Sequence, residues 1–268
     1  MKGFILSFKS EFYKSRKTLG FWAAILLPLL IVLLVFFGFW AHPDKIANLP
    51  GVILWMAYAG AISNVMGILL LPMYIIFIAY SVNSIEHKAD TWKTLFSLPI
   101  SKWSVYTAKY LYALFLVFLA LLLFYLFTLG SGNLLAMINP KFKFHDYNIN
   151  VFLGEEYLKL FLASLGILSI QFLLSLVWSD FLKPMGIGFI GTIAGIILVS
   201  TKNDYDYLLP YAHPLMALGS LIKHNNAPVI GIPVLEVDLF TKEIYVSLIV
   251  GAAIYIIGFF IVQKKSVK

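Results

Sequence analysis

The chain of 268 residues contains no cysteine, and charged residues make up only 12% of it. The lack of cysteine excludes disulfides, thiolate metal ligands, a cysteine nucleophile and lipid attachment through sulfur. The five histidines are scattered and form no H-E-x-x-H motif, and the phosphate-binding pattern G-x-x-x-x-G-K-[ST] does not occur. The sequence therefore predicts no catalytic residue, no metal site, no cofactor and no ATPase site of its own.

Long apolar runs dominate what is present, since 61% of the residues are hydrophobic and the mean hydropathy is +0.89. Crossing the hydrocarbon core of a bilayer takes roughly 20 apolar helical residues. Backbone groups in lipid find hydrogen-bond partners only within a helix or a closed barrel, and these runs are continuous rather than alternating. We therefore expect an all-α membrane protein with six transmembrane helices in one domain, residues 1–268. The expected spans are residues 20–40, 57–84, 110–129, 160–178, 185–201 and 244–262.

Two of these runs are unusual. The second is too long for one upright helix, because its charge-free stretch begins near Val52, and part of it should lie beyond the lipid or at the interface. The fifth is short and glycine-rich. Its Gly191 and Gly195 form a small-xxx-small pair, for which packing within the chain is the preferred interpretation and a dimer contact the alternative. No ionisable residue is expected well inside any of the six spans.

The basic residues predict the orientation of the chain. With the N-terminus inside, thirteen of the twenty lysines and arginines flank the spans on the cytoplasmic side and seven lie outside, as the positive-inside rule requires. Both termini are then cytoplasmic. The net charge of +7 is interpreted as a basic surface toward anionic lipid, so the bilayer is an expected partner and nucleic acid is not.

Residues 3–19 precede the first span and have an amphipathic pattern. Phe4, Phe8 and Phe12 follow helical spacing, while polar side chains that include Glu11 take the other side. We expect an interfacial helix with its aromatic face among the acyl chains. The alternative is a basic flank that only directs membrane insertion.

A second amphipathic segment, residues 86–104, lies between the second and third spans. Trp92, Leu95 and Phe96 have the i, i+3, i+4 spacing of one helical face. Pro99 cannot continue a helix. The pattern predicts a helix of about three turns, parallel to the membrane on its cytoplasmic side. Such a helix either transmits force from a soluble partner or serves as a passive connector, and the residues alone leave both open.

Two further segments were considered for function. Residues 202–243 contain four prolines, so we expect a re-entrant or outer-surface helical region rather than a seventh span. Glu155 and Glu156 resemble the glutamate pair of CAAX-type intramembrane proteases, but Leu160 stands where that family has an arginine. An intramembrane protease is therefore the weakest alternative.

The loop E-H-K-A-D-T-W-K-T-L-F-S-L-P-I-S-K, followed by Lys109, resembles the first cytoplasmic loop of ABC-2-type permeases. The resemblance is closest to the bacitracin and lantibiotic immunity permeases. In that family, a glutamate at the end of the second span precedes a short helix and a Pro-hydrophobic-Ser/Thr-basic turn. Here these positions are Glu86 and Pro99-Ile100-Ser101-Lys102.

The resemblance implies one half of an exporter that has no motor of its own. Such permeases lie in the cell inner membrane, pair with a second copy or a paralogue, and bind two copies of a cytoplasmic ABC ATPase. Antimicrobial peptides or other hydrophobic molecules are the implied substrates. A non-transporting membrane scaffold or sensor subunit is the alternative. The resemblance assigns ATPase coupling to five residues: Glu86, Trp92, Leu95, Phe96 and Pro99.

Overall fold

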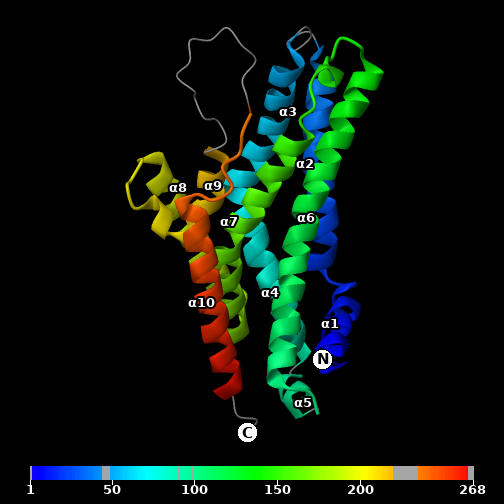
Figure 1. Ribbon diagram of the computed structural model, residues 1–268. Coiled ribbons are helices and arrows are strands. Elements are labelled where there is room, and N and C mark those ends of the chain that lie inside the picture. The colour runs from blue at the N-terminus through cyan, green and yellow to red at the C-terminus, as the bar shows by residue number, and fades with distance from the viewer. Residues whose placement is uncertain (1, 44–48, 90, 98, 220–234, 265–268) are drawn as a thin grey trace.

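The computed structural model describes residues 2–43, 49–89, 91–97, 99–219 and 235–264. Within these ranges every regular element is a helix, and the helices form one elongated bundle (Figure 1). The N-terminal helix α1 (Lys2–Ser15) and the C-terminal end of the last helix, α10 (Lys242–Lys264), lie at the same end of the bundle (Figure 1). We call this the terminal end, and the other the distal end.

Six helices are long and apolar enough to cross a membrane, which confirms the expected all-α membrane architecture. Hydropathy and length identify these helices, because in lipid the backbone N–H and C=O groups find hydrogen-bond partners only within a helix or a closed barrel. They are α2 (Leu19–Ala41), the continuous helix Gly51–Ala89, α6 (Lys102–Ile138), α7 (Asn150–Val177), α8 (Leu182–Ser200) and α10.

The second of these helices is composite. It consists of α3 (Gly51–Val65), a π-helical turn η2 (Met66–Leu70) and α4 (Leu71–Ala89). Its 39 residues span about 58 Å at 1.5 Å per residue, far more than the roughly 30 Å of hydrocarbon. The helix therefore reaches beyond the lipid, and α6, with 37 residues, does the same.

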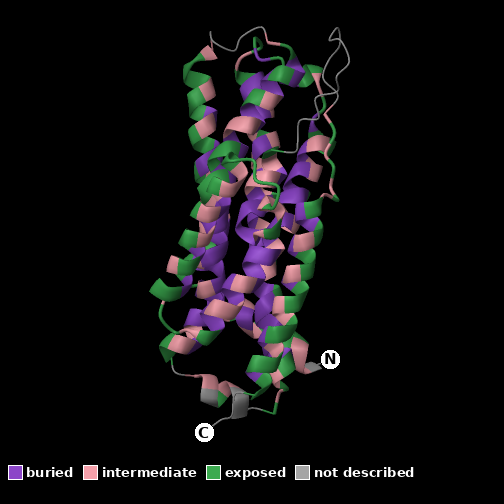
Figure 2. Ribbon diagram, turned by 90° about the vertical axis from the view of Figure 1, so that its left-hand side faces the viewer, coloured by how far each residue is buried: buried purple, intermediate pink, exposed green. Residues whose placement is uncertain are grey.

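Helix α7 lies at the centre of the bundle, where it packs against α4, α6 and α10. Buried residues follow the inner faces of the helices along the whole bundle, and exposed ones line its outside (Figure 2). The core is apolar and rich in aromatic side chains; Tyr106 and Tyr110 of α6, for example, contact Phe172 of α7. The outward-facing apolar side chains are those expected of a surface in contact with lipid.

Helix α1 packs along α6 with aromatic as well as polar side chains: the rings of Phe8 and Phe12 lie 6.1 and 6.5 Å from the Tyr112 ring of α6. Its polar residues Ser7, Glu11 and Ser15 are buried against the bundle, whereas Ile5 and Tyr13 are exposed. The polar stripe that includes Glu11 therefore faces the protein, and the position of α1 at the membrane interface stays a prediction. The reason is tertiary: Glu11 finds a cationic partner inside the bundle, and a buried ion pair requires that α1 turn this side inward.

The segment between α4 and α6 also differs from the expectation. The amphipathic helix α5 covers only Trp92–Ser97, so it is shorter than the three turns predicted. Helix α4 continues to Ala89, which makes Glu86 part of a spanning helix. The helix ends before Pro99, as the conformational restriction of proline requires. Residues 90 and 98 lie outside the described part.

The glycines of α8 pack against the segment that follows it. That segment forms two 3-10 turns, η4 (Asp206–Leu208) and η5 (Pro210–Ala212), and a short helix α9 (His213–Gly219). A Cβ on Gly191 would lie 2.7 Å from the Tyr211 ring, and one on Gly195 would lie 2.8 Å from the Ala212 nitrogen. The pair thus serves close packing within the chain. Residues 220–234 of the expected re-entrant region 202–243 lie outside the described residues.

Candidate coupling site

A buried lysine lies at the centre of a charge cluster at the terminal end. Lys109 of α6 is 0% exposed. Its Nζ donates to Glu86 Oε2 of α4 at 2.5 Å, to Glu11 Oε2 of α1 at 2.9 Å and to the Val82 carbonyl oxygen at 3.1 Å. All three ammonium hydrogens therefore have acceptors. One side chain joins three helices that are far apart in the sequence.

A second lysine completes the cluster. Lys14 Nζ lies 2.9 Å from Glu86 Oε1 and 3.2 Å from Glu11 Oε1. Although burial lowers the pKa of Lys14, the Glu11 and Glu86 carboxylates raise it by more, so the pKa lies above its ordinary value. Two carboxylates thus face two ammonium groups, and the cluster is neutral as a whole. We call these four residues the coupling cluster.

The cluster is sensitive to the loss of any of its three buried members, Glu11, Glu86 and Lys109. Removing one partner of a buried ion pair typically costs about 3–5 kcal/mol, because the other charge remains buried without compensation. Glu86 and Glu11 are 1% and 3% exposed, so water cannot replace a missing partner. The positions of α1, α4 and α6 are therefore interdependent at this end of the bundle.

Helix α5 contacts the cluster through Trp92. The ring of Trp92 lies 5.7 Å from Lys109 Nζ, a cation–π distance. Trp92 Nε1 also donates to His87 Nδ1 at 3.2 Å. Since the indole only donates, His87 Nδ1 accepts, and Nε2 carries the proton toward the Ser175 carbonyl oxygen of α7, 3.0 Å away. Trp92 thus connects α5 to α4, α6 and α7.

The other sequence-predicted site residues have different surroundings. Leu95 is half-buried and lines a cleft of about 160 Å³ between α5 and α1. Pro99 is exposed just after α5. Phe96 belongs to α5, and its side chain lies outside the described part. Of the five predicted residues, the structure brings Glu86 and Trp92 together around Lys109, while Leu95 faces α1.

Sequence reasoning missed three members of the cluster. Lys109 was counted as a flanking charge, and Glu11 and Lys14 as part of a solvated face. One signal was available in the sequence. Lys109 directly precedes the apolar run at 110–129, and Glu11 and Glu86 lie at the edges of two other apolar segments. Charges in such positions are expected to pair with one another.

Further charges are buried in the helices that can span a membrane, just beyond the ends of the spans predicted from the sequence. Lys159 of α7 is fully buried and lies 3.6 Å from Glu243 of α10. Glu156 of α7, expected in an outer loop, is 3% exposed and accepts a hydrogen bond from Ser63. The expected spans began at residues 160 and 244, so these charges fell just outside them. The helices in fact continue through them.

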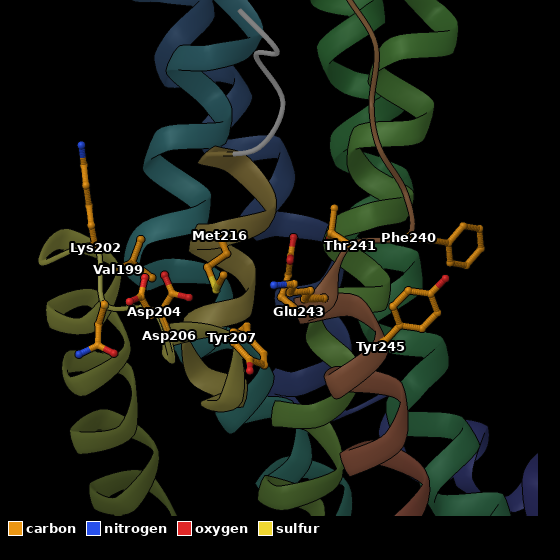
Figure 3. Close-up of a pocket in the computed structure, with 12 residues that line it drawn as sticks. Val199, Lys202, Asp204, Asp206, Tyr207, Met216, Phe240, Thr241, Glu243 and Tyr245 are labelled. Atoms are coloured by element: carbon orange, nitrogen blue, oxygen red, sulfur yellow. The ribbon is translucent and has the colours of Figure 1, made fainter.

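A pocket of about 660 Å³ opens at the distal half of the bundle, between α8, α9 and α10. Figure 3 shows Asp204 and Asp206 on one side of it and Glu243 on the other. Lys202 and Lys242 also line it, so its lining favours no single charge sign. Within the described residues, no group of three or more histidine or acidic side chains could hold a metal ion.

The fold and this site define a polytopic membrane protein with a charge cluster beside a short helix at its terminal end. Residues 7–195, more than half of the chain, match the sequence model of the ABC-2 family transporter proteins, and the chain therefore belongs to this family. Its members are transmembrane components without an ATPase site, and they generally work with an ATPase partner. No curated protein and no solved structure matches the chain.

Proposed function

We propose that this chain is the membrane-spanning subunit of an ATP-driven exporter, coupled through α5 and the coupling cluster to a separate cytoplasmic ATPase. The single observation that carries the proposal is the contact of Trp92 on α5 with Lys109, whose ammonium group joins α1, α4 and α6. A short helix placed on such a junction is suited to pass movement into the bundle. The family membership of the chain supports the ATPase partner.

The proposal places the terminal end in the cytoplasm. The basic residues counted on this side support that orientation. The ATPase then binds the outward side of α5, where Thr94 is exposed, rather than the side of Trp92 and Leu95, which contact the permease itself. This revises the coupling residues expected from the sequence: Glu86 and Trp92 transmit movement, and the opposite stripe of α5 receives the partner.

The coupling step follows from the contacts. When the ATPase closes on ATP, it shifts α5, and Trp92 moves relative to Lys109 and His87. Because Lys109 shares its hydrogens between Glu86 and Glu11, any displacement of the ammonium group changes both pairs. Helices α4 and α6 then move together with α1, and their distal halves rearrange around the substrate path.

Other parts of the proposal rest on the resemblance to bacitracin and lantibiotic immunity permeases. These parts are the cell inner membrane as the location, pairing with a second copy or a paralogue, two ATPase copies, and antimicrobial peptides or other hydrophobic molecules as substrates. The apolar side chains on the outside of the bundle would contact lipid, and a hydrophobic substrate could therefore enter the protein from the membrane. The scaffold or sensor subunit remains the alternative function.

The test is affinity purification of the full-length protein from native membranes, with identification of any ATP-hydrolysing chain that accompanies it. Thr94→Trp adds a bulky ring on the exposed side of α5 and should reduce ATPase recovery by at least about tenfold, equivalent to 1.4 kcal/mol. Thr201→Trp makes the same change at another exposed position, next to the distal pocket, and should leave recovery unchanged.

A second variant separates docking from coupling. Glu86→Gln lies within the bundle, so the ATPase should still accompany the protein, while substrate-stimulated ATP hydrolysis should fall. If no ATPase accompanies the wild-type protein, or if Thr94→Trp and Thr201→Trp recover it equally, the proposed docking is refuted and the scaffold function is favoured.

A further inference from the structure

Glu156 is a buried carboxyl group that the proposed coupling does not use. It belongs to the distal part of α7 and is 3% exposed. Its Oε1 accepts a hydrogen bond of 2.6 Å from Ser63 Oγ of α3. This hydrogen bond joins α7 to α3, whereas α3 packs mainly against α2, α6 and the turn at Phe144.

Among the described residues, no lysine, arginine or histidine forms an ion pair with this carboxyl group within 4.0 Å. Every other buried glutamate in the described ranges faces an ammonium group: Glu11 and Glu86 face Lys109, and Glu243 faces Lys159. Glu156 has a neutral hydroxyl as its hydrogen-bond partner instead. An ionised carboxylate without a cation is very unfavourable in an apolar interior, and such a group takes up a proton.

The surroundings of Glu156 supply hydroxyls rather than charges. Tyr157 follows it on α7, and the Tyr157 hydroxyl lies 3.3 Å from Thr128 Oγ1 of α6. Lys159 lies one turn further along, but its ammonium group pairs with α10. Among the titratable groups near Glu156, Glu155 and Tyr157 are its neighbours on α7, the Tyr125 ring of α6 contacts the Tyr157 ring, and Lys159 pairs with Glu243 of α10. Tyr58 is the titratable group of α3.

We propose that Glu156 is a proton-binding site, held as a neutral carboxylic acid that fastens the distal part of α7 to α3. The site does not depend on the proposed ATPase coupling. Ser63 lies just before the π-helical turn Met66–Leu70, where α3 joins α4. Loss of the proton would leave an uncompensated charge buried between α3 and α7, and this cost exceeds the gain from a stronger Ser63 hydrogen bond. Proton binding therefore stabilises the contact of α7 with the composite helix next to this turn.

The first test follows thermal unfolding of the full-length protein in detergent as the pH is raised. Glu156→Gln mimics the neutral acid and cannot lose a proton. The unfolding temperature of the wild type should fall relative to Glu156→Gln as the pH rises, because ionisation leaves an uncompensated charge in the interface. Glu155→Gln changes the neighbouring, partly exposed carboxyl and should follow the wild type. Parallel pH curves for the wild type and Glu156→Gln would overturn the proposal.

The second test reads the proton directly with the apolar reagent dicyclohexylcarbodiimide. A carboxylic acid adds its O–H across one C=N bond of the reagent, and the acyl group then moves to nitrogen as a stable acylurea, whereas an ion-paired carboxylate has no proton to add. Mass mapping at neutral pH should find the adduct on Glu156 and not on Glu11, Glu86 or Glu243. Loss of the adduct in Glu156→Gln, but not in Glu155→Gln, completes the assignment. Labelling of the ion-paired glutamates without labelling of Glu156 would contradict it.

Discussion

The ammonium nitrogen of Lys109 lies 2.5 Å from the Glu86 carboxylate, inside a bundle whose core is largely apolar. Glu86 stands near the end of α4 and Lys109 in the second turn of α6, and the short α5 lies between them in the sequence. The Glu86–Lys109 ion pair therefore joins the two ends of the segment that contains α5. Any force on α5 therefore acts on a segment that is tied at both ends.

Lys109→Met should lower the free energy of unfolding by about 3–5 kcal/mol, because Glu11 and Glu86 would then share Lys14 alone. Adding Glu86→Gln should restore part of this loss, since it removes the one excess negative charge. Denaturant unfolding in detergent measures the coupling between the two positions. Lys9→Met, an exposed lysine on α1, is the control, and an equally small effect at Lys109 would contradict the cluster.

The stability contributed by Lys14 should depend on alkaline pH. Its pKa in the folded protein lies above the ordinary value of 10.5, so the folded state retains this proton longer than the unfolded state. The stability that Lys14 contributes is complete below pH 10.5 and is lost as the pH rises through the pKa of Lys14 in the folded protein. Lys14→Met should therefore flatten the alkaline part of the unfolding curve. An unchanged alkaline slope would argue against the ion pairs of Lys14.

Gly195→Ala should destabilise the protein, because the new Cβ would lie 2.8 Å from backbone atoms of Tyr211 and Ala212 that cannot rotate away. Overpacking of this kind costs about 1–3 kcal/mol. Gly186→Ala in the same helix has open space around its Cβ and should be neutral or slightly stabilising. Equal unfolding temperatures for the two variants would mean that α8 does not pack on η5 in this way.

The orientation can be tested with single cysteines, since the chain has none of its own. Lys141→Cys lies at the distal end and Lys88→Cys at the terminal end, and both positions are exposed. A membrane-impermeant maleimide added to intact cells should label Lys141→Cys and should reach Lys88→Cys only after lysis. The reverse pattern would invert the orientation and with it the site proposed for the ATPase.

The sequence predicted the architecture well but assigned its charges poorly. The run Gly20–Trp40 identifies a spanning helix by length and composition alone. Glu156 and Lys159, in contrast, were placed in an outer loop, because a charge at the edge of an apolar run is read as the end of a span. The helix in fact continues through both residues, since each finds a partner on a neighbouring helix.

What the sequence determined by itself is the class of protein: six apolar runs in a bilayer form six helices, because lipid satisfies no backbone hydrogen bond. The spacing of Gly191 and Gly195 likewise indicated close helix packing. Only the tertiary structure decided which face of α1 turns inward and which charges meet. Glu11 and Lys109 are 98 residues apart in the chain, and helical periodicity describes the face of a single helix but not the partner that this face will meet.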